Sequence, residues 1–328
     1  MHVLKLVRPI NLLVIALTMY GMRIYFIPRI RINEIQGSSE PFDFFLLVFS
    51  TVLIAAAGNI INDYFDVRAD KINKPHKVII GKFVKPRWAI VLHWTMNFVA
   101  FSIACYLSWR YRTFWYVFIH LLSINALWFY SMYFKRKFLI GNIIIAGLTA
   151  LVPILCGIHF LEFIQSQRDY LPSNWSIETT LDTPLHTGWA FGSYFNTFVV
   201  LVFAFYAGIL NLIREIIKDI EDVTGDLILR AKTLPIVLGK RKTKRIAIIL
   251  LILLLLTSVP FLVDGYFLYQ AKFLTAFAPI FVIPIGVIFV IGLLSLKDEK
   301  RSLRRADLLL KILMVIGCSM PFYWYFLS

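Results

Sequence analysis

The residues Asn59-Ile-Ile-Asn62-Asp63-Tyr64-Phe65-Asp66, which continue to Asp70, close one of several long apolar runs in this chain. A second acidic segment, Lys218-Asp219-Ile220-Glu221-Asp222-Val223-Thr224-Gly225-Asp226, closes another. A single charged side chain at membrane depth costs about 2.5–3.5 kcal/mol even on the mildest scales. Grouped carboxylates also repel one another, so both segments need cations. A divalent metal that carries a phosphate ligand meets this need best.

The composition is that of an integral membrane protein. The chain has 328 residues, of which 59% are hydrophobic, whereas soluble domains are about 45–50% apolar. The formal net charge of +15 fits cationic loops that face anionic lipid, so membrane lipid is an expected partner. Nucleic acid is not expected, because no basic stripe interleaves with aromatic residues. The three cysteines have neither metal nor redox spacing.

Apolar runs predict the topology, since a membrane-spanning helix needs about 17–25 residues. Nine runs qualify, near residues 6–26, 42–63, 88–109, 113–133, 138–162, 189–213, 246–264, 270–294 and 307–327. Lys and Arg concentrate in the loops that follow even-numbered runs, which predicts a cytoplasmic N-terminus. We expect one all-α membrane domain, residues 1–328, with nine transmembrane helices around a central cavity. We also expect a multi-pass protein of the cell (plasma) membrane, with its active site facing the cytoplasm.

Within each acidic segment, the polar residues share one helix face. The first acidic cluster is Asn59, Asn62, Asp66 and Asp70, and the second acidic cluster is Asp219, Asp222 and Asp226. Intervals of three and four residues place each set along one side of a helix. Two such faces opposed across a cavity would present the oxygen ligands that Mg²⁺ prefers, together with substrate phosphate. Helix capping and ion pairing are the alternative, but two clusters on one side of the membrane favour metal binding.

A metal-bound diphosphate suggests a leaving group, because Mg²⁺ neutralises the charge that develops on it. Basic residues able to add to this stabilisation are Lys77, Lys135, Arg136, Arg214, Lys218 and Lys232. Loss of diphosphate from an allylic carbon leaves a carbocation, which aromatic faces can shield from water. Candidate aromatic residues are Trp128, Phe129, Tyr130 and Tyr133.

These residues also form longer motifs. The pattern Asn59-x-x-Asn62-Asp63-x-x-Asp66-x-x-x-Asp70, followed by Ile72-Asn73-x-Pro75, resembles the first signature of the UbiA-type intramembrane prenyltransferases. Asp222-x-x-x-Asp226, followed by Ala231-Lys232-Thr233-Leu234-Pro235 and Gly239, resembles the second. Arg8-Pro9, Tyr130-Ser131 with Lys135-Arg136, and Ile140-Gly141-Asn142 are also similar to the family. The resemblance implies Mg²⁺-dependent transfer of a prenyl group from a polyprenyl diphosphate to a lipophilic acceptor.

The resemblance also implies residue roles. Asn62, Asp66, Asp70, Asp222 and Asp226 would hold Mg²⁺, and we add Asp219 as a further metal ligand. The four aspartates Asp66, Asp70, Asp222 and Asp226 are the expected catalytic residues. Substrate contacts are expected from Asn59, Lys77, Tyr130, Lys135, Arg136 and Lys232. Asp63 or a substrate group would accept the released proton.

The acceptor is harder to infer. The D-x-I-N-x-P continuation and the Tyr130 to Lys135 spacing are most similar to geranylgeranylglycerol-phosphate geranylgeranyltransferases and chlorophyll synthases. Geranylgeranylglyceryl phosphate is therefore the expected acceptor, and an aromatic-acceptor or chlorophyllide-type enzyme of quinone, haem or chlorophyll biosynthesis is the alternative. A divalent-cation transporter is the alternative from another class. It would need acidic groups accessible from both sides, and the outer halves of the runs are expected to lack matching carboxylates.

Overall fold

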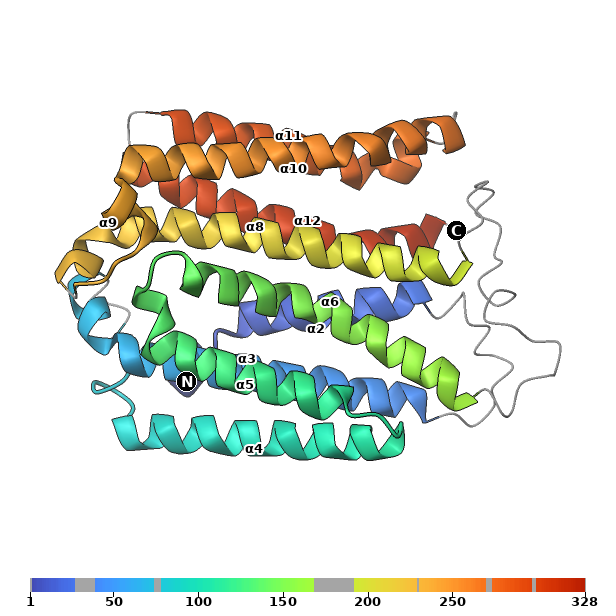
Figure 1. Ribbon diagram of the computed structural model, residues 1–328, viewed down its shortest axis with the longest axis horizontal. Helices are drawn as coiled ribbons and strands as arrows, with labels where there is room; N and C mark the ends of the chain where they lie inside the picture. The colour runs from blue at the N-terminus through green and yellow to red at the C-terminus, as the bar shows by residue number, and fades with distance from the viewer. Residues whose placement is uncertain are drawn as a thin grey trace.

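The computed structural model describes residues 2–26, 39–73, 78–167, 192–228, 230–269, 273–296 and 299–327. Long helices lie side by side and run roughly along one direction (Figure 1). They are α2 (Pro9–Phe26), α3 (Glu40–Asn73), α4 (Pro86–Arg110), α5 (Trp115–Met132), α6 (Ile140–Gln167), α8 (Gly192–Ile228), α10 (Lys240–Tyr269), α11 (Phe273–Ser295) and α12 (Glu299–Leu327). The short elements are α1 (His2–Val7), the 3-10 turn η4 (Phe134–Arg136) and α9 (Leu234–Leu238).

The long helices coincide with the predicted apolar runs. Over the described ranges, five of them (α3, α4, α6, α8 and α12) are long and apolar enough to cross a membrane, by length and composition. Two shorter apolar stretches, Pro9–Ile24 and Val282–Ser295, belong to α2 and α11. The all-helical membrane class is therefore confirmed. The number of nine crossings and the cytoplasmic N-terminus stay predictions.

Two apolar cores hold the helices together. The first packs α2 to α6 around large buried side chains such as Phe44, Tyr116 and Phe160. The second packs α8 against α10, α11 and α12, around residues such as Ile217, Leu251 and Leu310. Large apolar side chains on the outer surface stay exposed, which is the pattern expected where lipid replaces water.

The first and last long helices also pack on each other. The Thr18 hydroxyl of α2 lies 2.9 Å from the Cys318 sulfur of α12. Gly21 lets the two helices approach closely, because a Cβ there would lie 2.9 Å from the Phe322 ring and 3.2 Å from the Cys318 carbonyl oxygen. The first and last long helices are therefore neighbours in the bundle, and α8 and α12 lie between α10 and α11 on one side and α2 and α6 on the other (Figure 1).

The two helices that carry the acidic clusters run in the same direction. Both α3 and α8 end near α9, on the left in Figure 1. At 34 and 37 residues they are the longest helices in the described parts of the chain. An α-helix rises about 1.5 Å per residue, so each exceeds the roughly 30 Å thickness of the hydrocarbon layer. Their last turns can therefore reach the membrane–water interface, where a charged ligand can enter.

Candidate active site

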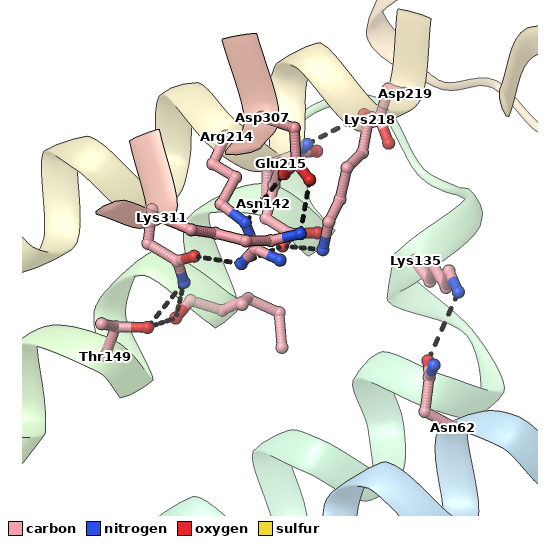
Figure 2. Close-up of polar contacts among 12 residues, drawn as sticks. Asn62, Lys135, Asn142, Thr149, Arg214, Glu215, Lys218, Asp219, Asp307 and Lys311 are labelled. Carbon is pink, nitrogen blue, oxygen red and sulfur yellow. Dashed lines mark hydrogen bonds and ion pairs between the residues drawn. The ribbon is translucent and has the colours of Figure 1, made fainter. Parts of the chain in front are cut away.

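The first acidic cluster surrounds one lysine from another part of the chain. Asp66 is buried and forms an ion pair with the Lys135 ammonium group. The same ammonium group donates to the Asn62 side-chain oxygen at 3.4 Å (Figure 2). Lys135 belongs to η4, between α5 and α6. The contact therefore joins residues about seventy positions apart, which spacing along α3 cannot predict.

A tight turn fixes the position of Lys135. Leu139 has a positive φ of 57°, a backbone conformation that residues other than glycine seldom adopt. Gly141, one residue into α6, lies directly against η4. A Cβ at Gly141 would be 2.9 Å from the Lys135 Cα and 3.0 Å from the Phe134 carbonyl oxygen. The turn thus needs a glycine at this position.

The charge state of Lys135 follows from its neighbours. Burial opposes the charged ammonium group, but the carboxylates of Asp66 and Asp70 favour it, as does the field of Tyr130. The net effect is a raised pKa for Lys135. A lysine with a raised pKa stays protonated at neutral pH. Lys135 is therefore a fixed positive charge beside the first acidic cluster.

The second acidic cluster is held by amide and hydroxyl donors. The Asn142 side-chain amide donates to Asp219 at 2.8 Å, and the Thr233 hydroxyl donates to Asp226 at 3.2 Å. The chain reverses after α8, where Arg230 has a φ of 53° and the Ala231 amide donates to the Asp226 carbonyl oxygen at 2.9 Å. This reversal returns the chain to the carboxylates at the end of α8.

The two clusters meet around Lys135. On one side its charge acts on Asp66 and Asp70, and on the other it acts on Asp219 and Asp226. Asp66 and Asp226 also act on each other electrostatically. The structure therefore brings residues of the two motifs together at one end of the bundle. Asp70 and Asp222 each have a further interaction of their own.

The residues at this end suit Mg²⁺ in chemical type. Carboxylate and amide oxygens are the hard ligands that this ion takes, usually with several waters and substrate phosphates. Among the described residues, no three acidic, histidine or cysteine side chains lie close enough together to hold a metal ion alone. Substrate phosphate oxygens would therefore have to complete the coordination.

The other expected substrate contacts have different positions. The Asn59 amide donates to the Val7 carbonyl oxygen at 3.0 Å, which ties α3 to α1. The Lys232 backbone amide donates to the Arg136 carbonyl oxygen at 2.9 Å, so this contact joins η4 to the segment after α8 while both side chains are exposed. Asp63 pairs with Arg8 at 2.5 Å. Lys77 lies outside the described residues.

Of the four aromatic residues expected to shield a carbocation, one lies at the site. Tyr130 is buried, and its ring would lie 3.2 Å from a Cβ at Gly141. Trp128 instead packs edge-on against Phe65 and beside aromatic residues of α4. The rings of Phe129 and Tyr133 are exposed. An aromatic run on a helix covers all its faces, so only one or two members can face a given site.

The sequence analysis missed a buried polar network at the far end of α3. Glu40 and Asp43 are fully buried there, so the expectation that the outer ends lack carboxylates is wrong. Arg23 donates to both Glu40 oxygens, at 3.1 and 2.6 Å, and the Tyr111 hydroxyl donates to Asp43 at 3.0 Å. Each carboxylate thus has its own partner, which fits a link between helices and gives the transporter hypothesis no support. The signal was present, as two acids three residues apart at the start of an apolar run.

Comparisons with known proteins agree with these observations. The profile of the UbiA prenyltransferase family matches residues 34–315. A digeranylgeranylglyceryl phosphate synthase of Saccharolobus solfataricus is 31% identical over 278 residues, which is 83% of each chain. The synthase of the same name from Natronomonas pharaonis is 32% identical over 227 residues, 69% of this chain and 68% of the relative.

Solved structures share the fold. One, from work on digeranylgeranylglyceryl phosphate synthase in membranes, has a TM-score of 0.58 at 21% identity and covers 99% of this chain and 96% of its own. A UbiA homologue from Archaeoglobus fulgidus, bound to DMAPP and Mg²⁺, has a TM-score of 0.51 at 12% identity, with 98% and 99% covered. Together with the sequence matches, the helical membrane fold leads to one conclusion: the chain belongs to the UbiA prenyltransferase family and is an integral membrane prenyltransferase.

Proposed function

We propose that this enzyme transfers a geranylgeranyl group from its diphosphate to geranylgeranylglyceryl phosphate, with Mg²⁺ as cofactor. The observation that carries the proposal is the position of η4, whose Lys135 pairs with Asp66 of the first motif and whose Arg136 carbonyl oxygen accepts from the Lys232 amide, just after the second motif. An anionic leaving group needs both oxygen ligands that hold a metal ion and a fixed positive charge nearby. The names of the curated relatives support the choice of acceptor.

The roles of the residues follow from their contacts. We assign the metal–diphosphate unit to Asn62, Asp66, Asp70, Asp222 and Asp226, with Asp219 oriented by Asn142. Bound Mg²⁺ would neutralise charge that develops on the departing diphosphate. Lys135 adds a second positive charge at the same place and needs no reorganisation, since the turn already fixes it. Tyr130 forms a wall that keeps water from the allylic carbon.

The membrane supplies the rest of the site. An isoprenoid chain is as apolar as the lipid around the bundle, so the donor tail can lie among the helices while its diphosphate stays at their ends. We propose that this end faces the cytoplasm and that residues 1–328 act as one domain. The contact between α2 and α12 supports the second point.

The proton of the acceptor hydroxyl needs a destination. Asp63 is committed to its ion pair with Arg8, so it could accept the proton only by giving up that ion pair. Once the carbocation has formed, the attacking alcohol becomes acidic, and the departing diphosphate is itself an adequate proton acceptor. We therefore propose that a substrate group, and not Asp63, accepts this proton.

A parallel acceptor assay tests the function. Purified protein in lipid nanodiscs receives radiolabelled geranylgeranyl diphosphate with geranylgeranylglyceryl phosphate, 4-hydroxybenzoate or chlorophyllide, each with Mg²⁺ and with EDTA. We expect labelled product with the first acceptor and loss of that product with EDTA. Product with only an aromatic acceptor or chlorophyllide would refute the acceptor, and full activity in EDTA would refute the metal requirement.

A further inference from the structure

A second charged group lies inside the bundle, next to the acidic clusters but separate from them. Arg214 and Lys218 of α8 and Lys311 of α12 form what we call the cationic cluster (Figure 2). The Arg214 Nε donates to Asp307 at 2.9 Å, and the Lys218 Nζ donates to Glu215 at 2.7 Å. Three cations thus face two carboxylates.

The cluster therefore carries a net charge of +1, although each of its cations has a carboxylate partner. The Lys311 Nζ shares Asp307 with Arg214, at 2.5 Å. The Arg214 and Asp307 side chains are 15% and 16% exposed, whereas those of Lys218 and Lys311 are 32% and 45% exposed. Charged groups inside a membrane protein are costly and are typical of functional sites. An excess cation there therefore indicates a place for an anion.

The guanidinium group of Arg214 is oriented as a binding group would be. Its Nη1 donates to the Asn211 side-chain oxygen at 3.2 Å, and the Asn211 amide donates to the Thr149 hydroxyl of α6 at 2.6 Å. The Nε is held by Asp307. The same Nη1 also lies 3.6 Å from a Glu215 oxygen, and within the described parts of the chain none of these contacts uses Nη2. Two fixed nitrogens hold the plane of the group, and the free one can donate to a phosphate oxygen.

The cationic cluster lies at a defined distance from the acidic clusters. Arg214, Lys218 and Asp222 follow at intervals of four on one face of α8. At about 1.5 Å per residue, Lys218 is about 6 Å and Arg214 about 12 Å from Asp222 along the axis. An alcohol and a phosphate on neighbouring glycerol carbons are four bonds, or about 5 Å, apart. The reacting atoms add about 3 Å, so such a phosphate would lie about 8 Å from the allylic carbon, a distance comparable to the one or two helix turns that separate these cations from Asp222.

We propose that the cationic cluster binds the phosphate monoester of the lipid acceptor and so selects phosphorylated over neutral lipid alcohols. The ion pairs with Asp307 and Glu215 would stay in place, and the phosphate would accept a charge-assisted hydrogen bond from the Arg214 Nη2. The proposal rests on the function proposed above. The donor diphosphate is the other anion that such a cluster can bind, and the separate KM values of donor and acceptor distinguish the two anions.

The test compares two acceptors that differ only in the phosphate. Initial rates are measured with geranylgeranylglyceryl phosphate and with geranylgeranylglycerol, for wild type and for Arg214→Gln. We expect the acceptor KM for the phosphorylated lipid to rise about 10- to 100-fold, the value of one or two charge-assisted hydrogen bonds. The donor KM and the rate with the neutral alcohol should stay within about twofold, so that selectivity is lost.

Two further variants serve as a control and as a replacement for Arg214→Gln. Arg304→Gln is the matched control, since Arg304 also joins α12 to α8 through an ion pair of 2.9 Å, with Glu221, but at the surface. It should leave the selectivity unchanged. If Arg214→Gln does not fold, Lys218→Met replaces it, because Lys218 pairs with Glu215 on its own helix and its loss cuts no link between helices.

The possible outcomes distinguish failure of the proposed phosphate site from failure of the proposed function. A rise in donor KM at constant acceptor KM would assign the cluster to the diphosphate and overturn the inference. A wild-type enzyme that uses both acceptors equally well would overturn it too, while leaving prenyl transfer intact. Transfer to aromatic acceptors alone would remove the proposed acceptor, and the inference with it.

Discussion

The Gly141→Ala substitution tests whether the active site depends on the exact placement of Lys135. The added Cβ would lie 2.9 Å from the Lys135 Cα and 3.0 Å from the Phe134 carbonyl oxygen, and ordinary contact begins at 3.4 Å. The backbone of η4 must therefore move by about 0.5 Å, because neither contact is with a flexible side-chain end. Lys135 would move with it, which changes its position relative to Asp66.

The size of the effect follows from two general rules. A misplacement of about 1 Å costs about 100-fold in rate, so a shift of half that size predicts a loss of about tenfold in kcat. Overpacking of a tight contact costs about 1–3 kcal/mol of stability. The variant should therefore remain folded, with a lowered Tm, and bind the acceptor as wild type does.

The assay uses geranylgeranyl transfer in nanodiscs together with thermal unfolding. Gly147→Ala is the matched control, since it is the same change on the same helix, with no other atom within 4 Å of the added Cβ. It should keep full activity and gain slightly in stability, because alanine favours helix by about 1 kcal/mol over glycine. Wild-type kcat in Gly141→Ala would refute the reasoning that places Lys135 at the reaction.

Further predictions concern individual charged and amide side chains of the two motifs and their partners. Lys135→Met should lower kcat at least 100-fold, as expected when a charge that stabilises a leaving group is lost, and Lys135→Arg should recover part of it; equal loss in both variants would mean that geometry matters and charge does not. Asp66→Asn and Asp222→Asn should abolish transfer in folded, membrane-inserted protein, whereas turnover at the wild-type rate by either would end the metal-site assignment. Asn142→Ala should weaken Mg²⁺ activation, measured as a rise in the Mg²⁺ concentration for half-maximal rate, because Asp219 loses its 2.8 Å donor. Asn59→Ala should lower stability by about 1 kcal/mol with little change in donor KM, since its amide binds the Val7 carbonyl oxygen; a large rise in donor KM would restore it as a substrate contact.

Much of this protein could be predicted without coordinates. Apolar run lengths indicate helices, and nine runs coincide with nine long helices within the described ranges. Intervals of four predict that Asn62, Asp66 and Asp70 share one face of α3, because the helix repeat is a property of the backbone itself. The same local argument fails for Asn59, which shares that face in part but donates to α1.

Contacts between distant segments could not be predicted from the sequence. Helix periodicity gives the face that a residue occupies, but not the rotation of one helix against another, which packing decides. Trp128 illustrates this, since it turned to α3 and α4 while its neighbour Tyr130 faced the site. Glu40 and Asp43 illustrate it again, as buried acids whose partners come from other helices.

By itself, the sequence determined the membrane class, the helices and the identity of the two acidic motifs, because each depends on composition or on local periodicity. Only the tertiary structure decided that Lys135 lies between the motifs and that Arg214 and Lys311 share Asp307. The Lys135–Asp66 and Arg214–Asp307 contacts join residues that are 69 and 93 positions apart. They exist because a tight turn at Gly141 and the packing of α8 on α12 bring those residues together.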